Sequence, residues 1–149
     1  MKVRDVMETI VVSVSPKTTY EHAAKVMQEH HYSGLPVLDE SGKLVGMLSE
    51  KDLFRALYPN YAEYARHPDE FSNAEQAESR IEDIRKDTVD LFMSKPVLSI
   101  EPEASVMKAG GIMLARGMHR LPVVENARMI GIVTRQDIYG AVLRHHLAF

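Results

Sequence analysis

At 149 residues, of which 45% are hydrophobic and 26% charged, the chain can bury the core of one domain or of two small, interdependent lobes. Its formal net charge is −3, whereas nucleic-acid-binding proteins usually carry an excess of basic residues. The absence of cysteine excludes disulfides, thiolate catalysis and cysteine-ligated metal sites. No run of about 18 apolar residues is present, and Asp5 and Glu8 interrupt the N-terminus where a signal peptide needs an apolar core. We therefore expect a cytoplasmic protein that is mature from Met1 and has neither a membrane nor a nucleic acid as partner.

The first third of the chain predicts the order strand, helix, strand, strand, helix. Residues 10–14 form a short β-branched run that Ser-Pro closes, which is typical of a strand. Thr18 and Glu21 have the spacing of a capping box, which predicts that a helix begins there. The helix has an apolar stripe at helical spacing: Tyr20, Ala23, Ala24 and Met27. Residues 35–38 and 44–48 predict a hairpin, and a second helix is expected from Ser49 to about Leu57.

A connecting segment of about residues 58–88 follows. Its stretch from residue 68 to 87 predicts one amphipathic helix with an apolar stripe: Phe71, Ala74, Ala77, Ile81 and Ile84. The connector either packs on its own small core or covers a ligand cleft or a dimer contact, and the sequence leaves both possibilities open.

The last third of the chain repeats the first. With Met7 aligned on Met93, a constant shift of 86 residues gives nine identical pairs in 32 positions, where ordinary residue frequencies give about two. The pairs are Met7/Met93, Val11/Val97, Ser13/Ser99, Pro16/Pro102, Ala23/Ala109, Met27/Met113, Leu35/Leu121, Pro36/Pro122 and Val37/Val123. One residue is then lost in a turn, and the shift becomes 85. One copy is too small to cover a three-stranded sheet, so we expect two copies packed sheet to sheet about a pseudo-two-fold axis.

A short phrase occurs once in each copy, as GMLSEKD at residues 46–52 and as GIVTRQD at residues 131–137. Ser49 and Thr134 follow a strand and begin a helix, so one interpretation is a capping box closed by Asp52 or Asp137. The other interpretation uses the same geometry for a ligand. A helix N-terminus favours a phosphate, and an ionised aspartate accepts hydrogen bonds from a ribose diol. A glycine inside a strand indicates that something approaches the backbone closely.

Together these features resemble a tandem pair of CBS domains, also called a Bateman module. The resemblance is carried by the DVM and DLFM openings, by GLPVLD and RLPVVE, and by the two Gly-h-h-Ser/Thr-x-x-Asp phrases, where h is apolar. It implies an α/β (α+β) fold of two β-α-β-β-α repeats at residues 1–57 and 89–149, with residues 58–88 as a helical connector. It also implies adenosine ligands in two clefts between the repeats.

The resemblance assigns the ribose to the two aspartates, the phosphate to Ser49 or Thr134, and the adenine to the first strand and to the residues before Leu-Pro-Val. We expect the second cleft to be the better nucleotide site, because arginine is the preferred phosphate partner and Glu50 replaces it in the first copy. The residues of the better cleft are Asp137, Thr134, Arg135, Arg120, His119, Met118, Pro96, Val97 and Lys95. Those of the weaker cleft are Asp52, Ser49, Thr9, Ile10, Val11, Tyr32, Ser33 and Gly34.

Other signals point away from catalysis. No zinc-protease, nucleophile-elbow, Walker or Rossmann motif is present, and the adjacent histidines at 30–31 and 145–146 point in different directions on a helix, so we expect neither an enzyme nor a metal site. Ala109-Gly110-Gly111 lies inside a predicted helix, where two glycines cost roughly 1–2 kcal/mol relative to alanine. We expect close helix packing there, within the pair or across a homodimer.

The sequence thus favours a non-catalytic regulatory module that signals to a partner protein as a homodimer. Its expected ligand is AMP, ADP or ATP, with S-adenosylmethionine less favoured, and no cofactor is required. The alternative is a ligand-free CBS dimerisation or docking module. Nucleic-acid binding, a third hypothesis, rests only on scattered lysine and arginine.

Overall fold

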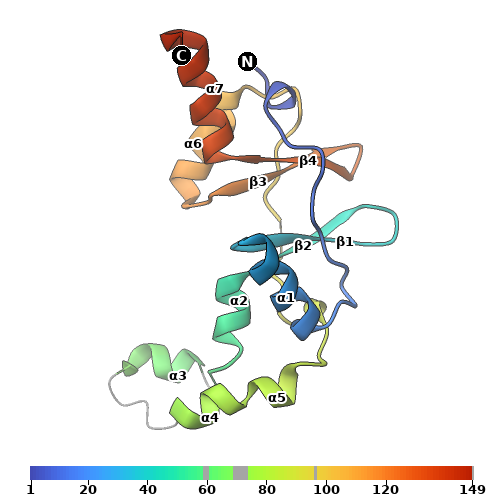
Figure 1. Cartoon of the computed structure of the whole chain (residues 1–149), viewed down its shortest axis with the longest axis vertical. Helices are drawn as coiled ribbons and strands as arrows, with labels where there is room; N and C mark the ends of the chain where they lie inside the picture. Colours follow the sequence, from blue (N-terminus) through green and yellow to red (C-terminus); the bar gives the residue numbers. More distant parts are fainter. Residues whose placement is uncertain (59–60, 69–73, 96, 149) are drawn as a thin grey trace. The chain divides into compact units, whose positions relative to one another are not determined.

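The computed structural model describes residues 1–58, 61–68, 74–95 and 97–148, and the chain divides into two compact units (Figure 1). We name them after Asp52 and Asp137, the aspartates of the repeated phrase. The Asp52 lobe consists of Ser13–Asp39 and Val45–Pro96, and the Asp137 lobe consists of Met1–Val12, Glu40–Leu44 and Val97–Phe149. None of the helices in the described part of the chain combines the length and the apolar character needed to cross a bilayer.

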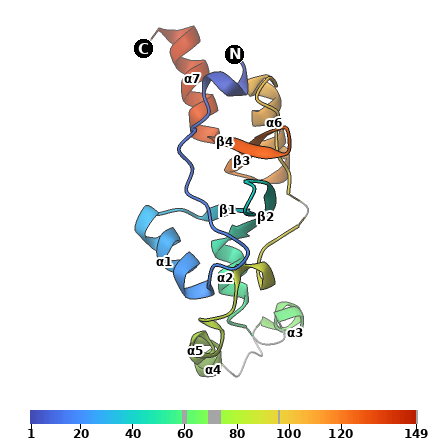
Figure 2. The same ribbon diagram turned by 90° about the vertical axis from the view of Figure 1, so that its right-hand side faces the viewer.

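The Asp52 lobe is built on a two-stranded sheet of β1 (Gly34–Leu38) and β2 (Leu44–Ser49). Helices α1 (Tyr20–His30) and α2 (Glu50–Arg55) lie on the same side of this hairpin (Figures 1 and 2). The connector adds α3 (Tyr61–Arg66), α4 (Ala74–Ser79) and α5 (Ile81–Ile84), and the short 3-10 helix η3 (Val89–Leu91) follows.

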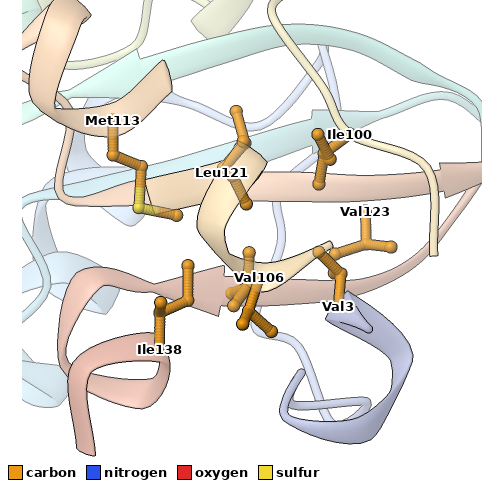
Figure 3. Close-up of a cluster of buried hydrophobic side chains, with 9 residues drawn as sticks. Val3, Ile100, Val106, Met113, Leu121, Val123 and Ile138 are labelled. Atoms are coloured by element: carbon orange, nitrogen blue, oxygen red, sulfur yellow. The ribbon is translucent and has the colours of Figure 1, made fainter. Parts of the chain in front are cut away.

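The Asp137 lobe repeats this arrangement with β3 (Arg120–Glu125), β4 (Arg128–Thr134), α6 (Val106–Arg116) and α7 (Arg135–Leu147). The strands are antiparallel, with Leu121 opposite Val133 and an irregularity between Val123 and Val124. The hairpin and both helices contribute to one buried apolar cluster (Figure 3). The predicted hairpins and the presence of two helices in each repeat are therefore confirmed, as is the mixed α/β class with two equivalent repeats.

The opening segment of each repeat packs in the lobe that holds the hairpin of the other repeat. Val3, in the 3-10 helix η1 (Val3–Asp5), is buried in the cluster of the Asp137 lobe, where Figure 3 shows its side chain among those of α6 and β3. Glu8 pairs antiparallel with Ile132 of β4, through two backbone hydrogen bonds of 2.9 Å each. The aligned residue Ser94 pairs in the same way with Met47 of β2, at 2.8 and 3.2 Å. The two openings are thus exchanged, and each lobe needs chain from both repeats.

The predicted strand at residues 10–14 is wrong. Residues 10–13 form no strand, and only Val14 pairs with a neighbour, the parallel partner Val37 of β1. The boundary between the two lobes lies between Val12 and Ser13, so this β-branched run links two units instead of lying along one sheet edge. The described residues 97–100 of the second copy behave in the same way, since Ile100 alone among them pairs, with Val123.

Two helix predictions also need correction. Helix α1 is capped by Thr19, which accepts from the His22 amide at 3.2 Å; Thr18 instead accepts from the Ser15 amide at 3.0 Å. Since Thr19 is the N-cap, Glu21 is the second helical residue, one position too early to close a capping box, and its carboxylate pairs with Arg85.

The single helix expected at 68–87 is interrupted. Helices α4 and α5 are separated at Arg80, whose side chain donates to the carbonyl oxygen of Ala56 at 2.9 Å. Of the predicted apolar stripe, Ala77 and Ile84 are buried, Ile81 is exposed, and Phe71 lies outside the described residues. The buried pair shows that part of the stripe does face the lobe.

Candidate functional site

The repeated phrase occupies the same place in both lobes, at the end of β2 or β4 and the start of α2 or α7. The Asp52 amide donates to Ser49 Oγ at 3.0 Å, and Asp52 Oδ2 accepts from the Ser49 amide at 2.9 Å. The corresponding bonds between Asp137 and Thr134 are both 3.0 Å. The capping interpretation is therefore confirmed in both copies. Each box uses one carboxylate oxygen, so it leaves the other oxygen for a second partner.

The second oxygen distinguishes the two aspartates. Asp52 Oδ1 lies 3.3 Å from Ser94 Oγ and 3.9 Å from an Arg55 guanidinium nitrogen, and the side chain is only 10% exposed. The positions that align with Ser94 and Arg55 are Glu8 and Gly140. An ionised glutamate side chain only accepts hydrogen bonds, and glycine has no side chain, so neither residue can donate one to Asp137. Within the described residues, the second oxygen of Asp137 has no hydrogen-bond or ion-pair partner. This carboxylate therefore retains an acceptor for a ligand.

Arg135 of the phrase and His119 lie side by side in the Asp137 lobe. The Arg135 amide donates to the His119 carbonyl at 3.0 Å, which joins the start of α7 to the residue before β3. The Arg135 guanidinium also contacts the His119 ring, 2.9 Å from Nε2. In the Asp52 lobe the Glu50 amide donates to the Ser33 carbonyl in the same way, at 2.9 Å. The backbone geometry is therefore alike in the two lobes, and the side chains at these positions differ. At this aligned position the Asp137 lobe carries the positive charge of Arg135, and the Asp52 lobe carries the negative charge of Glu50.

The helices that follow the phrases also differ in length. Helix α7 has 13 residues, whereas α2 has six. Aligned peptide dipoles place a partial positive charge at a helix N-terminus, where unpaired amides can hold an anion. The longer helix α7 therefore has the larger dipole, with its positive end at Thr134 and Arg135.

The strand glycines of the phrases are explained by packing within the protein. A Cβ on Gly131 would lie 2.7 Å from the Glu8 carbonyl oxygen and 2.9 Å from Met7 Sδ. A Cβ on Gly46 would lie 2.5 Å from Met93 Sδ. The close approach that the sequence predicted is real, and it comes from the exchanged opening segments. The glycines are therefore no evidence for a ligand.

The structure divides the remaining predicted residues between the lobes. Met118 packs against the core of the Asp137 lobe and Arg120 begins β3. The Asp137 lobe contains Val97 and also residues 9–11, that is Thr9, Ile10 and Val11. The resemblance groups these three residues with Asp52 instead. Lys95, grouped with Asp137, belongs to the Asp52 lobe, as do Tyr32, Ser33 and Gly34; Pro96 lies outside the described residues.

Sequence reasoning missed Ser94 and Arg55 as partners of Asp52. Arg55 lies three residues after Asp52 on one helix, a spacing at which side chains meet, so it carried a usable signal. Ser94 carried none, because its contact depends on the exchange of opening segments. In the part of the chain that the structure describes, histidine, aspartate and glutamate form no group of three that could hold a metal ion.

Comparison with known proteins agrees with this architecture. The family model described as "CBS domain" matches residues 3–59 and 83–144. An uncharacterized 17.7 kDa protein of Acidianus ambivalens is 30% identical over 146 residues, which are 97% of this chain and 75% of that protein. The A-adding tRNA nucleotidyltransferase of Aquifex aeolicus is 29% identical over 95% of this chain, which spans only 14% of that enzyme's length. The crystal structure of CBSX2 from Arabidopsis thaliana in complex with AMP has a TM-score of 0.74 and 26% identity, covering 97% of each chain.

Proposed function

Because the chain belongs to the family of CBS-domain proteins, as a pair of such domains, we propose that it is a non-catalytic regulatory module that binds an adenosine nucleotide. We further propose that it acts as a homodimer and signals to a partner protein. A ligand that prefers one conformation of the module would shift its population, and the partner would respond to that shift.

The observation that carries the proposal is the second carboxylate oxygen of Asp137. A ribose diol offers two hydroxyl donors, and an ionised carboxylate only accepts. Since the capping box occupies Oδ2, a diol can bind at the other oxygen without opening the helix N-terminus. Arg135 and Thr134, at the start of the same helix, supply the charge and the donors for a phosphate. Support also comes from CBSX2, a protein of the same fold that binds AMP.

The Asp52 site is expected to bind a phosphorylated ligand more weakly. Its aspartate already has Ser94 and Arg55 beside the second oxygen, and a ligand diol must displace them. Glu50 at the start of α2 repels a phosphate, where Arg135 attracts one. We propose that this site is empty, weak, or occupied by an uncharged nucleoside.

Calorimetric titration with AMP, ADP, ATP and S-adenosylmethionine tests the proposal. Asp137→Asn is the informative variant, because its amide oxygen still accepts from the Thr134 amide and so preserves the helix cap. Losing a charged hydrogen bond worth about 1.5–3 kcal/mol lowers affinity tenfold or more. Asp52→Asn is the matched control and should lose less. Equal losses in the two variants, or no loss for Asp137→Asn, would contradict the assigned asymmetry.

A second titration separates the ribose from the phosphate. Arg135→Gln should weaken binding of AMP and leave binding of adenosine nearly unchanged, because adenosine has no phosphate. A loss for both ligands would instead show that Arg135 supports the fold of the site. Absence of heat with all four nucleotide ligands would favour the alternative function, a ligand-free docking or dimerisation module.

A further inference from the structure

The two exchanged opening segments make equivalent backbone contacts in their lobes. The Arg4 amide donates to the Pro102 carbonyl at 2.9 Å, and the Asp90 amide donates to the Pro16 carbonyl at 3.1 Å. The two prolines are one of the identical pairs of the repeat. In each segment the fully buried anchor is a valine at the first position of η1 or η3. Backbone bonds and buried valines therefore do not determine which segment packs in which lobe.

The charges of the two segments do differ. In the Asp137 lobe the Lys2 ammonium lies 2.6 Å from the Glu103 carboxylate. The Arg4 guanidinium lies 2.7 Å from Glu103 and 3.0 Å from Glu125. Hydrogen bonds from Lys2 and then Arg4 lower the pKa of Glu103 from its usual 4.5. A basic opening segment is thus held by two carboxylates of the lobe in which it packs.

The aligned positions in the Asp52 lobe have charges of opposite sign. Arg4 aligns with Asp90, and Glu103 aligns with Lys17. The Asp90 amide bonds to the carbonyl of the residue before Lys17, so the acidic segment packs beside a basic position. In an unexchanged arrangement, with each segment on its own repeat, Arg4 would instead lie beside Lys17. Asp90 would lie beside Glu103. The exchange therefore joins opposite charges, and the unexchanged arrangement joins like charges.

An aromatic contact favours the exchange as well. Phe92, at the end of the second opening segment, packs edge-on against Tyr20 of α1, with ring centroids 5.2 Å apart. The residues aligned with these two are Val6 and Val106, which both belong to the apolar cluster of the Asp137 lobe. In the unexchanged arrangement Phe92 would face Val106 and Val6 would face Tyr20. The favourable edge-on pairing of the two rings would be lost.

We propose that these charges and this ring pair select the exchanged arrangement, and that they thereby decide which aspartate keeps an open carboxylate oxygen. The exchange brings Ser94 to Asp52 and Glu8 to the Asp137 lobe. In the unexchanged arrangement the hydroxyl donor would lie in the lobe of Asp137, and the glutamate would lie in the lobe of Asp52. The selecting residues are thus positioning residues for both sites. Their effect on ligands rests on the proposed function, whereas the selection itself does not.

The selection comes from the sum of several weak pairs. The ion-paired side chains are 42–59% exposed, so one pair changes an equilibrium only about two- to fivefold. Interchanging Lys17 and Glu103 reverses the sign of every pair in which they take part, in both arrangements. Glu125 aligns with Asp39, which has the same charge and does not discriminate. The interchange should therefore shift the ratio of the two arrangements by at least about tenfold.

Disulfide trapping reports the arrangement, because the chain has no cysteine. Thr88 lies opposite Thr19 in an antiparallel bridge, and Lys2 lies opposite Ser105 in the equivalent one. Opposite Cα atoms in such a bridge are about 4.5–5.5 Å apart, which a disulfide spans. Thr88→Cys with Thr19→Cys, the exchanged pair, should therefore cross-link readily. Thr88→Cys with Ser105→Cys, the unexchanged pair, tests the alternative. The two pairs are matched, because Thr19 and Ser105 are both helix N-caps.

The measured quantity is the initial rate of disulfide formation in the unexchanged pair, divided by that in the exchanged pair. Lys17→Glu with Glu103→Lys leaves the net charge unchanged and should raise this ratio at least about tenfold. Lys17→Gln with Glu103→Gln removes the same attractions without creating new ones, so it should raise the ratio less. An unchanged ratio, or an equal rise in the two double variants, would overturn the proposal.

A rescue experiment distinguishes selection from general loosening of the fold. Lys2→Glu, Arg4→Glu and Asp90→Arg, added to the interchanged variant, restore opposite charges in the exchanged arrangement. The ratio of rates should return toward the wild-type value, whereas a loosened or misfolded chain would keep a high ratio and refute the selection. Trapping uses no nucleotide, so its failure leaves the proposed function intact. Absence of AMP binding would in turn leave this inference intact.

Discussion

Val3 offers the most direct test of the exchanged opening segments. It stands in the first turn of the chain, yet its side chain is buried in the core of the Asp137 lobe, with Ile100, Val106 and Val123. Val3→Ala removes two methyl groups, worth about 0.8 kcal/mol each in transfer free energy, and leaves a cavity. We expect a loss of about 2–3 kcal/mol in the free energy of unfolding.

The assay must report which lobe is weakened. Hydrogen exchange read by mass spectrometry on peptides should show faster exchange for Val3→Ala in residues 101–148 than in residues 14–57. Val89→Ala is the matched variant, because Val89 aligns with Val3 and is buried with η3 in the Asp52 lobe. It should produce the opposite pattern. If Val3→Ala instead loosened residues 14–57, the opening segment would belong with its own repeat and the exchange would be refuted.

Three further predictions follow from local geometry. Ala127 has φ of 65°, which favours glycine, so Ala127→Gly should raise the free energy of unfolding by about 0.5–1 kcal/mol in urea titrations. Gly131→Ala should cost about 2–3 kcal/mol in the same assay, because the added Cβ meets a backbone oxygen; Gly46→Ala should cost less, because it meets the movable end of a methionine. Hydrogen bonds from Arg85 lower the pKa of Glu21 from its usual 4.5, so the pairing stabilises the fold above that pH and is lost as pH falls through the lowered pKa. Arg85→Gln should therefore raise the pKa of Glu21 measured by NMR titration; an unchanged value would mean that the pair does not persist in solution.

The sequence predicts the hairpins and the principal helices well, because their apolar spacing reflects one-sided burial within each lobe. It fails at residues 10–14, where a β-branched run crosses the boundary between two lobes, so that only Val14 pairs with a sheet edge. The exchange of opening segments was not predictable either. The alignment of Met7 with Met93 shows that the two residues are equivalent. It does not show whether each opening segment packs on its own repeat or on the other one, because the alignment would be the same in both cases.

The candidate site shows a different limit of sequence reasoning. The motif Ser/Thr-x-x-Asp predicts a helix cap and a ligand-binding carboxylate equally, and these looked like competing interpretations. The structure shows that they are compatible, since the cap occupies one oxygen of each aspartate. What distinguishes the two aspartates is the second oxygen, and its surroundings depend on residues outside the motif: Ser94 and Arg55 in one lobe, Glu8 and Gly140 in the other.

The role of the second carboxylate oxygen can therefore be tested by giving the Asp137 lobe the arginine that lies beside Asp52. Gly140→Arg places in α7 the side chain that Arg55 provides in α2, three residues after the aspartate. The nearest atom to a Cβ at Gly140 is the movable end of Arg144, at 3.1 Å, so the lobe should tolerate the change. The new guanidinium should occupy the second oxygen of Asp137 and compete with a ribose diol.

Adenosine is the appropriate ligand for this test, because an added arginine would also attract a phosphate and mask the loss. We expect Gly140→Arg to weaken adenosine binding about tenfold, the effect of roughly 1.4 kcal/mol, and Gly140→Gln, of similar bulk but without charge, to have a smaller effect. If both variants bind adenosine as the wild type does, the second oxygen of Asp137 takes no part in binding. The ranking of the two sites would then have to rest on Arg135 and His119 alone.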